Sequence, residues 1–331
     1  MSASGGQGGS VKVATGELGG MRIAAGSWLT IALIVSACAS PRATAPAPTA
    51  LAATAPAPTA PVAPTPSPSE TPAVSAVASA APGRPHVFVI VMENASLARA
   101  LAAPAVGTLA SKYRVATNYH AVARPSLPNY LALTSGSTWG VADDDDHALP
   151  AGGIGAQLSM AGVSWRAYME GLTAGGCRNS PYPYALKHNP FAYYGGACPK
   201  NVVPFDALDA DLAGETPQFV WITPGLCHDG HDCALAEAGP WLAQLVARIV
   251  ASASFRERGA LFVVWDEGDE GDRANLVPLI VVTPDPAARR SAELYDHYSL
   301  LATIEDTFGL SRLGAAASAR SLTDLLSLRG P

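Results

Sequence analysis

The sequence predicts an α/β fold in which a mostly parallel central sheet carries helices on both faces. Short apolar runs rich in Val, Ile and Phe recur through the second part of the chain, and they do not alternate with polar residues. Such runs are typical of strands buried on both faces of a parallel sheet. Stretches with helical character separate the runs, and this alternation indicates an α/β sandwich.

The domain boundaries follow from composition. Of the 331 residues, those from 39 to 83 are almost entirely Ala, Pro, Thr, Ser and Val, without a single aromatic side chain. Such a tract buries too little apolar surface to offset its ordering entropy, and its prolines favour an extended chain. We therefore expect residues 39–83 to be a disordered linker and residues 84–331 to form one folded domain.

Residues 1–38 have the features of an export signal. Met21-Arg22 precedes an apolar run from Ile23 to Ala37, which is too short to span a bilayer comfortably and fits a signal segment. The run ends in Val35-Ser36-Ala37-Cys38, which resembles the bacterial lipoprotein signal. We expect an exported protein anchored by lipid at Cys38 to the outer face of the cell membrane, with release from the cell left open. The alternative is an ordinary cleaved signal with a chance cysteine, and Met21 is a candidate for the true start.

Charge bounds the class of partner. The formal net charge is −6, and residues 1–83 carry three basic against two acidic residues, which leaves −7 on the domain. That balance argues against a nucleic-acid partner. A negatively charged ligand would need local positive charge on such a domain, and a bound metal ion would supply it.

Four cysteines remain if Cys38 carries lipid. An exported protein meets an oxidising compartment, and proximity in sequence favours the pairs Cys177–Cys198 and Cys227–Cys233. A zinc site is the alternative, although none of the spacings is C-x-x-C.

Functional-looking residues follow three of the apolar runs directly. The run from His86 to Met92 leads into Glu93-Asn94, and the run from Ala260 to Trp265 leads into Asp266-Glu267. The run from Gln218 to Thr223 leads into a loop with His228, Asp229, His231 and Asp232. Two further strands are expected at Val163–Met169 and Val277–Val282, and helices are expected from Leu131 onward, at Pro240–Ser252 and at Ser299–Phe308. Because ligand sites gather at the carboxyl ends of parallel strands, these clusters are expected to converge.

Ser126 is the candidate nucleophile. It stands just before a helix that Pro128 is expected to start, where a helix N-terminus stabilises an anion. No G-x-S-x-G pattern surrounds it, which argues against an ordinary serine esterase. A divalent metal would activate the hydroxyl, and hard oxygen donors are available on Glu93, Asn94, Asp266 and Glu267. The run from Asp143 to Asp146 with His147 lacks the pattern of an EF-hand, so it is interpreted as a solvated acidic loop.

Several motifs carry a resemblance, in one order along residues 86–312. They are Val91-Met92-Glu93-Asn94, Pro125-Ser126-Leu127-Pro128-Asn129-Tyr130 with Ser135-Gly136, Asp229-Gly230-His231-Asp232-Cys233, Trp265-Asp266-Glu267-Gly268, and His297-Tyr298-Ser299-Leu300-Leu301 with Ile304-Glu305-Asp306. The domain resembles the bacterial phosphoesterase family of acid phosphatases and phospholipase C enzymes, a branch of the alkaline-phosphatase-like superfamily.

The resemblance implies the roles of the site residues. The metal would be surrounded by Glu93, Asn94, Ser126, Asp266 and Glu267, with Ser126 as nucleophile. The phosphate, or a second metal, would lie near Asp229, His231, Asp232 and His297. His231 or His297 would protonate the leaving alcohol. Arg124 stands where the family often has histidine, and it is a candidate phosphate donor.

These expectations describe a metal-dependent phosphoesterase that works through a phosphoseryl intermediate. Phosphate monoesters are slightly favoured, and a phospholipase C-type phosphodiesterase acting on phospholipid is the alternative. A lipoprotein that only binds phosphate ligands is the rival of another class. A sulfatase is disfavoured because Ser126-Leu127-Pro128-Asn129-Tyr130 lacks the arginine of the C/S-x-P-x-R pattern. The metal is left open among Ca, Mg, Mn and Zn.

Overall fold

A computed structural model describes residues 83–326. The predicted signal segment, Cys38 and the predicted linker up to residue 82 lie outside the described residues, as do residues 327–331. Within the described part, no helix is both long and apolar enough to cross a membrane.

An eight-stranded sheet forms the centre of the domain in the order β5-β4-β6-β1-β7-β8-β2-β9. Its strands are β1 (His86–Met92), β2 (Arg114–Ala116), β4 (Trp165–Met169), β5 (Val202–Pro204), β6 (Phe219–Thr223), β7 (Gly259–Trp265), β8 (Leu279–Val282) and β9 (Arg289–Ser291). Only β8 runs antiparallel to its two neighbours, so the sheet is mostly parallel, as predicted. A separate two-stranded sheet pairs β3 (Tyr119–His120) with β10 (Tyr295–Asp296).

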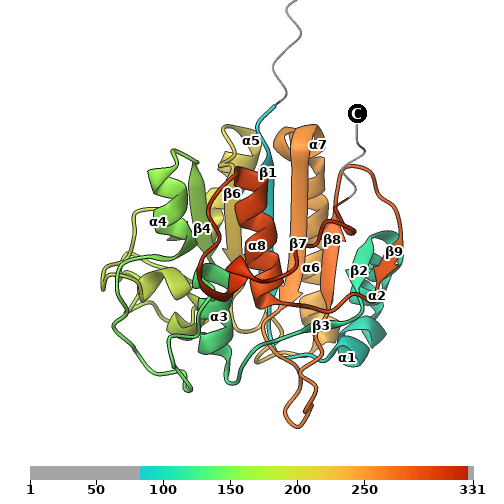
Figure 1. Cartoon of the computed structure of the whole chain (residues 1–331), viewed down its shortest axis with the longest axis horizontal. Helices are drawn as coiled ribbons and strands as arrows, with labels where there is room; N and C mark the ends of the chain where they lie inside the picture. Colours follow the sequence, from blue (N-terminus) through green and yellow to red (C-terminus); the bar gives the residue numbers. More distant parts are fainter. Residues whose placement is uncertain (1–82, 327–331) are drawn as a thin grey trace, which may run out of the picture. The chain divides into compact units, whose positions relative to one another are not determined.

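Helices cover both faces of the sheet (Figure 1). One face carries α3 (Ser126–Ser135), α4 (Gly153–Met160) and α8 (His297–Phe308), and the other carries α5 (Leu208–Ala213), α6 (Leu235–Ala251) and α7 (Ala253–Arg258). The remaining helices are α1 (Leu97–Ala102), α2 (Pro104–Lys112), which packs on α6, and four short 3-10 helices at Leu186–His188, Pro190–Ala192, Phe205–Ala207 and Gly314–Ala317. This arrangement confirms the predicted α/β sandwich.

Helix α6 has an amphipathic sequence pattern, whereas α3 is buried on all sides and its sequence shows no such pattern. In α6 the buried residues Leu235, Leu242, Leu245 and Ile249 recur at helical spacing on one face. Every residue of α3 is buried, so no polar face marks its limits. The helix begins at Ser126 rather than at Pro128, and the proline lies in its first turn, where a missing N–H costs no helical hydrogen bond.

The five predicted strands are all present, and their differences from prediction are small. The strand expected at Val277–Val282 is β8, which begins two residues later at Leu279 and is antiparallel. An apolar run does not encode strand direction, which is decided by the connections. Both expected disulfides, Cys177–Cys198 and Cys227–Cys233, are present.

Gly136 is the residue that ends α3, and its substitution tests how closely the end of this helix packs against the chain around Leu313. It has φ +69°, and a Cβ added to it would lie 2.2 Å from the Leu313 carbonyl oxygen. Gly140 has φ +74° but open space around its Cβ position. We expect Gly140→Ala to cost only the backbone term, about 1 kcal/mol, and Gly136→Ala to cost about 3 kcal/mol or more in the free energy of unfolding. Denaturant unfolding of both variants measures the difference, and equal losses would contradict this account.

Candidate functional site

Two pairs of residues with side-chain oxygens meet at the carboxyl ends of adjacent central strands. Because β1 and β7 are parallel with Met92 opposite Trp265, Glu93-Asn94 and Asp266-Glu267 leave the sheet side by side. The Asp266 N–H donates to the Met92 carbonyl at 3.0 Å, and the Asn94 side-chain amide donates to Glu267 Oε1 at 2.8 Å. The strands end at the lower edge of the sheet in Figure 1, where α3 also lies.

The loop after β6 brings a fourth carboxylate to the same place. β6 is the other neighbour of β1, and the Glu93 N–H donates to the Asp229 carbonyl at 2.9 Å. The Cys227–Cys233 disulfide closes this loop around Asp229. The Asp229 side chain is fully buried and accepts a hydrogen bond from the His231 N–H at 2.8 Å.

Ser126 at the start of α3 faces these carboxylates. Its Oγ donates to Glu93 Oε2 at 3.1 Å, and one turn later Tyr130 donates its hydroxyl hydrogen to Glu93 Oε1. Both side chains are buried, as is the Glu93 carboxylate. The helix therefore presents a nucleophile candidate and an orienting phenol to the same carboxylate.

Several buried side-chain oxygen atoms at this place, which could coordinate a metal ion, have no hydrogen-bond partner among the described residues. They are Asn94 Oδ1, Asp229 Oδ2, Asp266 Oδ2 and Glu267 Oε2. His188, stacked on the Tyr130 ring, lies with its two nitrogens 3.3 Å from Glu93 and 3.3 Å from Asp229, but neither contact has hydrogen-bond geometry. Ligand atoms of Glu93, His188 and Asp229 lie within 4.8 Å of one another, close enough to hold one metal ion. Unpartnered buried oxygens are costly unless a cation or water satisfies them, and this donor set suits a cation.

The electrostatics of the site lead to the same conclusion. Burial raises the pKa of Glu93 well above its usual range, and the charges of Asp266 and Asp229 raise it further. Burial, followed by the charge of Glu267, raises the pKa of Asp266. Burial also raises the pKa of Asp229 and that of Glu267 to about 7. Four acids that resist ionisation together would ionise readily around a divalent cation.

The histidines predicted from the sequence have different surroundings. His231 Nδ1 lies 2.7 Å from Asp232, and its Nε2 accepts a hydrogen bond from Lys187 at 3.2 Å. His297 is fully buried, with Nε2 2.6 Å from the Asp266 carbonyl and Nδ1 2.9 Å from the Tyr119 hydroxyl. Burial lowers the pKa of His297 to about 4. With both ring nitrogens occupied, His297 is built to position Asp266, and a role in proton transfer stays a prediction.

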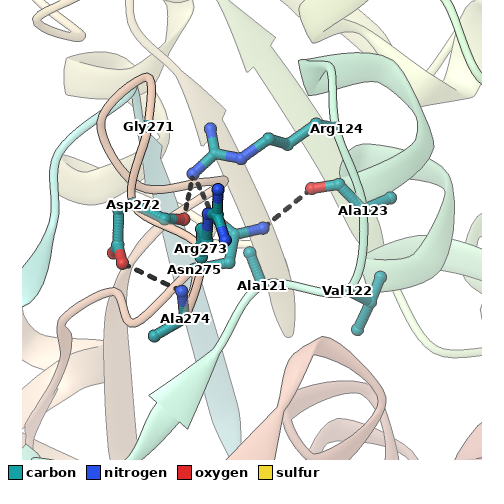
Figure 2. A pocket seen from close by; sticks show the side chains of 9 residues that line it. All are labelled: Ala121, Val122, Ala123, Arg124, Gly271, Asp272, Arg273, Ala274 and Asn275. Atoms are coloured by element: carbon teal, nitrogen blue, oxygen red, sulfur yellow. Dashed lines mark hydrogen bonds between the residues drawn. The ribbon is translucent and has the colours of Figure 1, made fainter.

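Arg124 lies at the rim of the site. Its guanidinium donates to the Gly268, Asp269 and Asp272 carbonyls and to Asn275 Oδ1, and Nη1 lies 3.6 Å from Glu267. Figure 2 shows the side chain crossing an open pocket toward the segment 271–275. Arg124 thus holds the loop that follows Glu267, and phosphate binding by this residue stays a prediction.

Four residues of the site were not singled out by sequence reasoning, namely Lys187, His188, Tyr130 and Asp144. None of the four directly follows a core strand, the position at which the acids of the site are expected. The interpretation of residues 143–147 as a solvated loop is wrong for Asp144, because its carboxylate accepts the Leu127 N–H at 2.9 Å and pairs with Lys187 at 3.0 Å. Asp144 lies in a loop, Lys187 and His188 lie in a short 3-10 helix, and Tyr130 lies in a helix buried on all sides, so no apolar periodicity marks any of them.

The sequence of the chain is similar to those of known phosphoesterases. A sequence model of the Phosphoesterase family matches residues 98–311. The chain is 31% identical over 264 residues to a phosphatidylinositol-3-phosphatase of Mycobacterium tuberculosis, an alignment covering 77% of the chain and 87% of that protein. It is 30% identical over 247 residues to a probable acid phosphatase of Kluyveromyces lactis, covering 69% of the chain but only 59% of that protein.

A solved structure from Vibrio parahaemolyticus, described as a protein of the alkaline phosphatase superfamily, shares the fold. Its TM-score is 0.54 at 12% sequence identity, over 73% of this chain and 70% of that chain.

The raised pKa values predict that removal of metal destabilises the protein more at high pH. Without a cation, the folded state holds protons on Asp229 and Glu267 up to about pH 7, so the stability present at acid pH is lost as pH rises through that value. A divalent cation competes with those protons and binds more strongly as they leave. We expect chelation to lower Tm by about 5 °C or more at pH 8 and by less at pH 5. Calorimetry of chelated and metal-loaded protein at both pH values tests this, and an equal difference at both would contradict it.

The Tyr130 hydroxyl supplies a second test of the same site. Tyr130→Phe removes the hydrogen bond that orients Glu93 while keeping the ring on His188. We expect it to weaken divalent-metal binding by about tenfold or more, as is common for groups that orient ligands. The matched control is Tyr194→Phe, which loses a buried hydroxyl bonded to Thr134 on the same helix. Titration calorimetry should show unchanged affinity in the control, and equal weakening in both variants would mean a general packing effect.

Proposed function

Because the chain belongs to the phosphoesterase family and is a hydrolase of phosphate esters, we propose that it is a metal-dependent phosphatase with Ser126 as nucleophile. The proposal is carried by one observation: Ser126 Oγ donates at 3.1 Å to the buried Glu93, beside Asp229, Asp266 and Glu267, each of which keeps one oxygen without a hydrogen-bond partner among the described residues. A carboxylate in hydrogen-bond contact with a serine can accept the hydroxyl proton, which makes the serine oxygen a stronger nucleophile.

We propose that Glu93, Asn94, Ser126, Asp266 and Glu267 surround a divalent cation. The unpartnered oxygens of Asn94, Asp266 and Glu267 support this set. When bound, the cation supplies positive charge against the negative charge that develops on the phosphoryl group. Oxygen donors suit Mg, Mn or Ca, whereas participation of His188 or His231 would suit Zn.

In the proposed reaction, Ser126 Oγ forms a bond to phosphorus while the bond from phosphorus to the leaving alcohol breaks. Glu93 Oε2, which already accepts the Ser126 hydrogen bond, takes the hydroxyl proton. His231 protonates the leaving oxygen, a role that requires its Nε2 to exchange the Lys187 hydrogen bond for a proton and that suits it better than His297, whose ring is fully buried. Water then attacks the phosphoserine, releasing phosphate and restoring Ser126. The α3 N-terminus stabilises the negative charge.

Phosphate monoesters are the proposed substrates. The mycobacterial relative is a phosphatidylinositol-3-phosphatase and the fungal relative is described as an acid phosphatase, and both names denote monoester hydrolysis. A phospholipid monoester is within this class and would suit a membrane-anchored enzyme. Phospholipase C-type hydrolysis of diesters is the alternative.

Export and a lipid anchor at Cys38 complete the proposal. The two disulfides are typical of proteins in an oxidising compartment. Mass spectrometry of the mature N-terminal peptide tests the anchor, since an unmodified Cys38 in membrane-extracted protein would reject it.

Replacement of the nucleophile tests the mechanism. We expect Ser126→Ala to lower kcat/KM for p-nitrophenyl phosphate by about 10³-fold or more, because the variant loses the oxygen that forms the covalent intermediate. The control is Ser111→Ala on α2, which loses a hydroxyl bonded to the Thr108 carbonyl. Acid-quenched wild-type enzyme should carry a phosphoryl group on the peptide containing Ser126. Full activity in Ser126→Ala would refute the assignment.

A substrate panel separates monoester from diester hydrolysis. It contains p-nitrophenyl phosphate, bis-p-nitrophenyl phosphate, a phosphatidylinositol phosphate in vesicles and a phosphatidylcholine analogue. Release of inorganic phosphate from p-nitrophenyl phosphate and from the phosphatidylinositol phosphate, without turnover of the two other diesters, supports the proposal, and preferential release of phosphocholine supports the phospholipase C alternative.

A further inference from the structure

A single carboxylate bridges the start of α3 and a lysine beside the nucleophile. Asp144 Oδ1 accepts the Leu127 N–H at 2.9 Å, and Asp144 Oδ2 lies 3.0 Å from Lys187 Nζ. Leu127 directly follows Ser126. Asp144 and Lys187 are both largely buried, with 27% and 23% of their side chains exposed.

These two donors are where a substrate phosphoryl group needs them. A group under attack by Ser126 Oγ lies at the N-terminus of α3, where the first-turn N–H groups point at an anion. The Lys187 charge is felt inside the site, where it partly offsets the rise in pKa that burial causes at Glu93 and Glu267. Lys187 also donates to His231, which places the ammonium between the helix start and the proposed proton donor.

The two contacts of the Asp144 carboxylate are with residues outside its own loop. The neighbouring Asp143 pairs with His147, and Asp146 pairs with Arg178, whose guanidinium also donates to the Ala192 carbonyl. The Asp143–His147 pair lies within the loop, and Asp146 ties the loop through Arg178 to the Ala192 carbonyl, so one tether remains without Asp144. Withdrawal of one side chain would free the Leu127 N–H and Lys187 without unfolding the loop.

From these contacts we propose that Asp144 is an internal substitute for the substrate phosphoryl group, and that Lys187 is a phosphate-binding residue of the active site. A carboxylate, like a phosphoryl group, offers two oxygens to two donors. The incoming dianion repels the Asp144 carboxylate, takes over the Leu127 N–H and Lys187, and leaves Asp144 in solvent. The free enzyme thus keeps these donors satisfied, at a cost in phosphate affinity. This inference rests on the proposed function of Ser126.

Inorganic phosphate is the probe, applied to metal-loaded protein in two ways. Its Ki is measured against p-nitrophenyl phosphate, and its affinity is measured by the shift in Tm, which needs no turnover. Absence of turnover in the wild type would reject the proposed function, while the Tm shift would still test the present inference.

Asp144→Asn removes the competing charge and keeps an oxygen for Leu127. We expect it to bind phosphate about three- to tenfold more tightly than the wild type. The matched control is Asp145→Asn, which removes one charge from an exposed neighbour in the same loop and should change phosphate affinity by less than about twofold.

Lys187→Gln should weaken phosphate binding by about tenfold or more, and Lys187→Arg should restore most of it. Lys187→Arg also keeps the test valid if the Gln variant folds poorly. Weaker phosphate binding in Asp144→Asn would overturn the proposal, because Asp144 would then serve to position Lys187. Unchanged affinity in either Asp144→Asn or Lys187→Gln would overturn it as well, as would loss of bound metal from Asp144→Asn in elemental analysis.

Discussion

The central constraint on this protein is the burial of four carboxyl groups in one place. Glu93, Asp229, Asp266 and Glu267 are all less than 5% exposed, and burial raises the pKa of each. Such a group is unfavourable as four isolated charges, and hydrogen bonds from Ser126, Tyr130 and Asn94 satisfy only some of the oxygens. A bound divalent cation would offset this repulsion, so the burial of these acids is also the basis of the proposed chemistry.

The sheet order makes this concentration possible. β1 is central, with β6 on one side and β7 on the other, and all three strands are parallel. Their carboxyl ends therefore open onto one edge, and each delivers an acid there. The only antiparallel strand, β8, lies beyond β7 and contributes none of the site residues. Helix α3 completes the site with Ser126 and Tyr130, which both donate hydrogen bonds to Glu93.

Segments that connect the strands complete the site around this frame. The disulfide-closed loop 227–233 carries Asp229 and His231, and the loop that contains Lys187 and His188 lies between the Cys177–Cys198 partners. The acidic segment 143–147 reaches the start of α3 through Asp144. The strands therefore fix the carboxylates, whereas the loops determine how an anion is received.

The sequence by itself determined the fold class, the five main strands, the disulfide pairs and the acids at strand ends, because buried parallel strands leave a continuous apolar run and end in their functional residues. It also identified Ser126, through a helix start and a resemblance. It left undecided the direction of β8, the extent of the fully buried α3, and the places of Lys187, His188 and Asp144. These depend on contacts between segments far apart in the chain, such as Asp144 with Lys187 and His188 with Glu93. No local periodicity records such contacts, so only the tertiary structure decides them.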